Sequence, residues 1–182
     1  MKGVLVPMFL YLPKHFDQNE WFIIIVLILS LFLVKLPKRM PAEVSCLIVL
    51  LSLAIPNIID HSIAAISPYD VYRLNDSEKY EVFDILLSGV YIPFGFLCVY
   101  FYEWLRPKKT KIVLYILCWA LFAIGFEFVI VRLHVFTYHG WRLAYSFPTY
   151  LLVISLFLVY YEFLLFHHKN KDIGSLSRMN DR

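Results

Sequence analysis

Long apolar runs constrain the fold of this chain more than any other feature of its sequence. The run WFIIIVLILSLFLV (21–34) is typical of several. Hydrophobic residues make up 60% of the 182 residues and charged residues 17%, whereas an ordinary soluble domain is about 45–50% apolar and about 25% charged. A helix of about 20 apolar residues matches the hydrocarbon thickness of a bilayer. The chain is therefore expected to be an integral membrane protein built from helices.

Five membrane-spanning helices are predicted from these runs, with the approximate ranges 20–36, 41–60, 83–105, 112–134 and 146–166. The first apolar run is short, and Trp21 and Lys35 extend it because both side chains can reach the headgroup layers. We expect an all-α, polytopic transmembrane bundle over residues 1–166, followed by a solvated tail at 167–182. Residues 1–13, MKGVLVPMFLYLP, are interpreted as an interfacial lead-in that stays on the mature protein.

The distribution of Lys and Arg predicts how the bundle is oriented. Eleven of the 17 Lys and Arg residues fall in the loop between spans one and two, the loop between spans three and four, and the tail. Five spans place all three of these segments on the same side of the membrane. Since basic residues concentrate in cytoplasmic loops, the N-terminus is expected outside and the C-terminus in the cytoplasm.

One carboxylate lies well inside the fourth predicted span. Glu127 is the sixteenth residue of that span counted from Ile112, which places it roughly 7 Å inside the outer hydrocarbon boundary of an upright helix. Burying an ionised carboxylate at such a depth costs at least about 2.5 kcal/mol. A cationic partner, protonation or a water-filled cavity would relieve this cost.

Basic side chains follow Glu127 closely in the sequence. His134 comes two turns later on the same helix face and is the expected partner. Arg132 lies about 140° around the helix and is less suited to direct contact. His139 and Arg142 come after the following turn and are expected to reach back.

Polar side chains of two other spans are expected at the same depth. Asn57 and His61 are four residues apart at the outer end of the second span, so they share a helix face, and Asp84 stands at the outer start of the third. If these faces converge, they form an outward-facing pocket. Its predicted binding residues are Glu127, His134, His61, Asn57, Asp84, Arg132, His139, Trp141 and Arg142. The alternative is that these polar groups only fix helix packing and register.

The sequence contains no established catalytic or metal-binding motif. It has no GxSxG, no phosphate-binding glycine loop and no HExxH. Its three cysteines fall in apolar runs without a CxxC neighbour, so they are interpreted as packing residues. We predict no metal site and no cofactor, and the one candidate catalytic residue is Glu127.

One segment resembles a known group of proteins. The segment FEFVIVRLHVFTYHGWRLAYSFPTYL (126–151) has a glutamate in a penultimate span, an aromatic turn and a Trp-basic-x-x-Tyr-Ser element that opens the last span. In this it resembles a family of small, uncharacterised multi-helix membrane proteins of Gram-positive spore-forming bacteria. The resemblance implies a bacterial cytoplasmic membrane and no assigned activity. The segment is also similar to small lycopene-cyclase-like membrane domains, but their paired acidic motif is missing here, so that activity is not inferred.

These features predict a non-enzymatic integral membrane protein: a sensor, an accessory subunit or a binder of an apolar ligand, with its pocket around Glu127. One alternative is a membrane enzyme that acts on a lipid or isoprenoid with Glu127 as general acid or base. Another is a small proton-coupled transporter, which would act as an oligomer because the five spans show no internal repeat. The expected partners are the lipid bilayer and either other membrane proteins or further copies of the chain. The net charge of +3 does not indicate nucleic acid.

Overall fold

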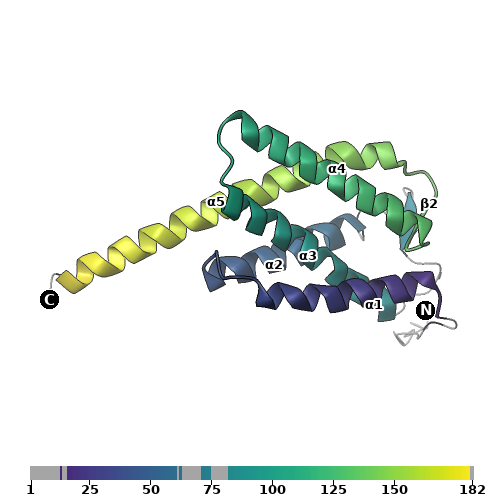
Figure 1. The fold of residues 1–182 in the computed structure, drawn as a ribbon, viewed down its shortest axis with the longest axis horizontal. Coiled ribbons are helices and arrows are strands. Elements are labelled where there is room, and N and C mark those ends of the chain that lie inside the picture. Colours follow the sequence, from purple (N-terminus) through teal and green to yellow (C-terminus); the bar gives the residue numbers. More distant parts are fainter. Residues whose placement is uncertain (1–12, 14–15, 61, 63–70, 75–81, 181–182) are drawn as a thin grey trace, which may run out of the picture.

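The computed structural model describes residues 13, 16–60, 62, 71–74 and 82–180. This part of the chain is mainly helical (Figure 1). Its helices are α1 (Gln18–Ser30), which the 3-10 helix η1 (Leu31–Lys35) continues, α2 (Ala42–Ile59), α3 (Val82–Leu105), α4 (Thr110–Arg132) and α5 (Leu143–Asn180). Two short strands, β1 (Tyr72–Leu74) and β2 (Phe136–Tyr138), complete it.

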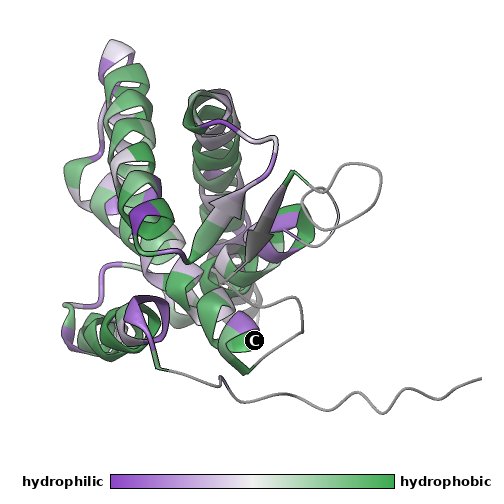
Figure 2. Ribbon diagram, turned by 90° about the vertical axis from the view of Figure 1, so that its right-hand side faces the viewer, coloured by the Kyte–Doolittle hydropathy of each residue, from purple (hydrophilic) through white to green (hydrophobic). Residues whose placement is uncertain are grey.

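Five helices of the described part, with η1 counted as part of α1, are long and apolar enough to cross a membrane. The predicted helical class and the predicted number of long apolar helices are therefore confirmed, and they fit a multi-pass membrane protein. Hydrophobic residues cover most of each helix, and hydrophilic residues gather at helix ends and connections (Figure 2). A capping box begins α1, since the Asp17 N–H donates to the Glu20 carboxylate at 2.8 Å.

The ends of the last two spans differ from those expected. The fourth helix stops at Arg132 instead of residue 134, because His134 adopts a left-handed backbone conformation with φ of 57°. The fifth helix begins at Leu143 and does not stop at Phe166 but continues to Asn180. The predicted tail at 167–182 is thus helical as far as the structure describes it, and Figure 1 shows it extending beyond the other helices.

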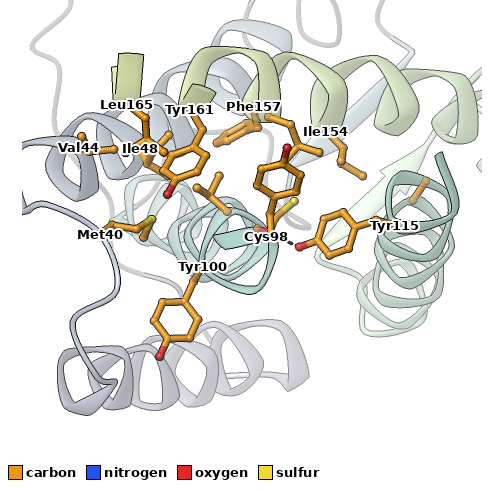
Figure 3. Close-up of a cluster of buried hydrophobic side chains, with 14 residues drawn as sticks. Met40, Val44, Ile48, Cys98, Tyr100, Tyr115, Ile154, Phe157, Tyr161 and Leu165 are labelled. Atoms are coloured by element: carbon orange, nitrogen blue, oxygen red, sulfur yellow. Dashed lines mark hydrogen bonds between the residues drawn. The ribbon is translucent and has the colours of Figure 1, made fainter. Parts of the chain in front are cut away.

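Helix α3 occupies the centre of the arrangement and packs against α1, α2 and α5, while α4 packs mainly against α5. The larger apolar core lies between α2, α3, α4 and α5. Ile48, Cys98, Tyr115, Phe157 and Tyr161 point toward one another in it (Figure 3). A second core lies nearer the strands and includes Ile23 of α1, Leu87 of α3, Ile130 of α4 and Phe136 of β2. We call the end of the bundle that carries the strands the sheet end.

The two strands form an antiparallel sheet that the sequence did not predict. Tyr72 pairs with Tyr138, and the register continues to Leu74 opposite Phe136. Three successive backbone N–H groups, those of residues 139–141, donate to the Val71 carbonyl oxygen at 2.9–3.0 Å. These bonds fix the segment between α4 and α5 to the segment between α2 and α3. The polar, acidic sequence of residues 67–84 predicts an external loop or a short surface helix, and most of these residues lie outside the described part.

Gly95 allows α2, α3 and α5 to approach one another closely. A Cβ at this position would lie 2.1 Å from Ser52 Oγ of α2 and 2.7 Å from a ring carbon of Phe157 of α5. Gly125 of α4 differs, because a Cβ there would meet no atom of the described residues within 4 Å other than those of its chain neighbours and its own helix backbone. The two glycines therefore form a matched pair, one crowded and one open.

We expect Gly95→Ala to lower the free energy of unfolding by about 1–3 kcal/mol, because the added methyl group overpacks the junction of three helices. Gly125→Ala is the control and should leave stability unchanged or raise it by up to about 1 kcal/mol through helix propensity. Equilibrium unfolding in mixed micelles measures both. Equal effects of the two substitutions would contradict the close approach at Gly95.

A candidate binding cavity with two carboxylates

A cavity of about 180 Å³ lies between α2, α3, α4 and α5 below the sheet. Most of its lining is aliphatic or aromatic and includes Leu87, Phe94, Ala123 and Ile154. Its polar lining includes two carboxylates, Asp60 and Glu127, together with the side chains of Tyr72, Tyr91, Tyr138, Trp141, Ser146 and Tyr150. An apolar chamber with a few grouped polar atoms is the usual form of a small-molecule site.

Glu127 is buried in this cavity, with 4% of its surface exposed. It lies five residues before the end of α4, roughly 7.5 Å along the helix axis. Its Oε1 atom accepts hydrogen bonds from the Tyr138 hydroxyl of β2 and from Ser146 Oγ of α5, the latter at 2.7 Å. Its Oε2 atom is buried and has no hydrogen-bond partner among the described residues. Half of the carboxylate is thus satisfied and the other half retains free acceptor capacity.

Asp60 is the second buried carboxylate and directly follows α2. Its Oδ1 accepts a hydrogen bond of 2.6 Å from the Tyr72 hydroxyl of β1, and its Oδ2 accepts one from the Tyr91 hydroxyl of α3. Asp60 therefore connects three elements of the sheet end.

The sheet links the two carboxylates. Tyr72 and Tyr138 are directly opposite in its register, so their side chains leave the sheet on the same face. One donates to Asp60 and the other to Glu127. Trp141 strengthens the link: its indole N–H donates to Ser146 Oγ at 2.9 Å, and its ring packs edge-on against Tyr72 at 5.9 Å. The two short strands thus form a cap over the polar end of the cavity.

The sequence-based prediction of cationic partners for Glu127 was wrong. Hydroxyl groups, not imidazole or guanidinium groups, donate its hydrogen bonds. His134 does not continue the helix face of Glu127, since α4 has ended, and its side chain is exposed. Arg132, His139 and Arg142 are also exposed, and the Arg132 guanidinium lies 5.1 Å from the ring centre of Phe128.

The other predicted site residues do not all lie in the cavity. Trp141 lines the cavity as expected. Asn57 instead joins α2 to α3, because its Oδ1 accepts a hydrogen bond of 2.8 Å from Ser88 Oγ. Asp84 is buried in α3 but does not line the cavity. His61 lies outside the described residues. Among the residues that the structure describes, no group of three or more His, Cys, Asp or Glu side chains could hold a metal ion.

Sequence reasoning left Asp60 and its tyrosines out of the site. Asp60 ends an apolar run, a position from which a side chain can reach the headgroups, and its burial is recognised only from its contact with Tyr72 of β1. Tyr91 had a usable signal: with Asp84 and Ser88 it forms a polar stripe along the start of α3, and Ser88 and Tyr91 both contact α2. Tyr72 had no such signal, because nothing local marks β1 as a strand.

The opposite end of the bundle carries a separate ionic cluster. Arg106 pairs with Glu103, three residues earlier on the same helix, and with Glu162 of α5 at 3.1 Å. The Tyr161 hydroxyl also donates to Glu103. Arg106 and Glu162 are largely exposed, so this cluster is best explained as a connection between α3 and α5.

Comparison with protein-family models, with curated proteins and with solved structures finds no match to this chain. The class that the fold defines is that of a multi-pass helical membrane protein, and function has to be argued from the cavity.

The phenols of the cap predict a pH dependence of stability. Burial raises the pKa of Tyr72 and of Tyr138 above the ordinary value of 10.0, and the neighbouring carboxylate of each raises it further. A phenol with a raised pKa holds its proton more tightly in the folded state. Its contribution to stability is therefore complete below pH 10 and is lost as the pH rises above that value.

We expect the free energy of unfolding to fall as the pH rises above about 10, by at most about 1.4 kcal/mol per pH unit for each phenol. Tyr72→Phe and Tyr138→Phe should each make this fall less steep, and the double variant should do so most. Unfolding in mixed micelles at several pH values measures the slope. A double variant with the wild-type slope would show that neither phenol is held protonated by the fold.

Proposed function

We propose that this protein binds a small apolar or amphipathic molecule within the membrane, in the cavity between α2, α3, α4 and α5. The observation that carries the proposal is the unpartnered Oε2 of Glu127, a buried acceptor in a chamber lined mainly by apolar side chains. A buried polar atom without a partner costs about 1–3 kcal/mol. A ligand that supplies a hydrogen bond there would recover this free energy.

The size of the cavity is compatible with this function. An engineered apolar cavity of about 150 Å³ in another protein is large enough to bind benzene. At about 180 Å³, the chamber described here can accept a ring or a short hydrocarbon segment of a ligand. Its partly polar end would then orient that ligand with its head group toward the sheet.

The orientation and location of the protein are part of the proposal. The distribution of Lys and Arg supports an N-terminus outside and a C-terminus in the cytoplasm. The resemblance of the segment 126–151 to membrane proteins of Gram-positive bacteria supports a bacterial cytoplasmic membrane. In this orientation the sheet end is the outer end, and the polar end of the cavity lies in the outer half of the bilayer.

A membrane enzyme is the second candidate, because two carboxylates line one cavity. Asp60 and Glu127 are both buried there, and paired carboxylates can divide the roles of general acid and general base. We favour binding because both oxygens of Asp60 are already occupied by tyrosine hydroxyls. Such an Asp60 is suited to holding the cap in place.

Filling the cavity tests the binding function. Ala123 of α4 lines the cavity, whereas Ala54 of α2 is exposed and lies outside it. We expect at least one apolar or amphipathic molecule to co-purify with the wild-type protein and with Ala54→Phe. Ala123→Phe should deplete it by at least about tenfold, because the ring occupies the space of the ligand. Mass spectrometry of the bound small molecules measures this.

A smaller substitution, Ala123→Leu, serves if the phenylalanine variant does not fold. The same set of bound molecules in the wild type, in both cavity variants and in Ala54→Phe would contradict the proposal. So would a wild-type protein that carries no small molecule.

A further inference from the structure

Most hydrogen-bond donors that line the cavity already have an acceptor, whereas one acceptor there has no donor. The donors of Tyr72, Tyr91, Tyr138, Ser146 and Trp141 are all directed at the two carboxylates or at one another. Ser52 and Thr149 donate to backbone carbonyl oxygens of their own helices. The Tyr150 side chain lines the same cavity. Glu127 Oε2, in contrast, is an acceptor that no described group engages.

The charges around the cavity also favour a ligand that donates a hydrogen bond and carries a positive charge. Two acidic side chains line it, and none of the lining residues in the described part of the chain is Lys, Arg or His. Arg132, His134 and Arg142 are exposed, outside the lining. An anionic head group would therefore meet like charge, and most of the donors that line the cavity are already directed at the carboxylates or at other protein oxygens. A cationic head group would meet opposite charge and a free acceptor in a site of low dielectric.

We propose that the cavity selects amphiphiles whose polar group is a protonated amine, with the ammonium donating to Glu127 Oε2 and the hydrocarbon part lying against the apolar lining. This inference rests on the proposed binding function and adds the class of ligand. A charge-assisted hydrogen bond to a buried carboxylate is stronger than a neutral one. The same hydrocarbon carrying an alcohol or a carboxylate therefore binds less tightly.

Three probes with one chain and different head groups test this inference: octylamine, octanol and octanoate. Radiolabelled probes are equilibrated near neutral pH with the protein in zwitterionic lipid nanodiscs, and the amount in empty nanodiscs is subtracted. Octylammonium is expected to bind at least about tenfold more tightly than either of the other probes. Glu127→Gln is expected to abolish this preference. Glu162→Gln, which alters the ionic cluster at the opposite end, is the matched control and retains it.

The outcomes separate this inference from the proposed function. Equal binding of the three probes, or an ammonium preference that survives in Glu127→Gln, would overturn the choice of head group. If Ala123→Phe still blocked all three probes, the binding function would stand. Failure of the wild-type protein to bind any probe would count against both. The head-group comparison in the wild type alone decides the inference if Glu127→Gln does not fold.

Discussion

A carboxylate placed at hydrocarbon depth must find hydrogen-bond donors inside the protein, since no water is there to supply them. Glu127 meets this requirement with two hydroxyls, one from β2 and one from α5. Neither donor belongs to the helix that carries the carboxylate. Burial of Glu127 therefore depends on the turn after α4 and the start of α5 lying against α4.

The cap also provides a hydroxyl donor to a second buried carboxylate. Asp60 is buried under β1 by Tyr72, as Glu127 is under β2 by Tyr138, and the pairing of these two tyrosines makes the two contacts depend on each other. A strand pair of three residues each contributes little stability by itself. Here its side chains connect α2 to α4 and close one end of a chamber. The chamber is left mostly apolar, with a free acceptor at its polar end.

The sequence predicted the helices because the thickness of a bilayer sets the length of an apolar run. Such a run can be recognised from consecutive residues alone, without knowledge of distant contacts. The pairing of Glu103 with Arg106 is local in the same way, since residues three positions apart are neighbours on a helix. The partners of Glu127 were missed for a related reason. His134 was placed by extending the helix beyond Arg132, where it in fact ends. Tyr138 and Ser146 reach Glu127 through a turn whose path depends on contacts with the distant residue Val71.

The contact between Glu127 and Tyr138 can be measured most directly by a double-mutant cycle. The free energy of unfolding is determined in mixed micelles for the wild type, Glu127→Met, Tyr138→Phe and the double variant. A hydrogen bond to a buried carboxylate predicts a coupling energy of about 1.5–3 kcal/mol. Additivity to within about 0.5 kcal/mol would mean that the two side chains do not interact, and the cap, the cavity and the ligand site argued from them would lose their basis.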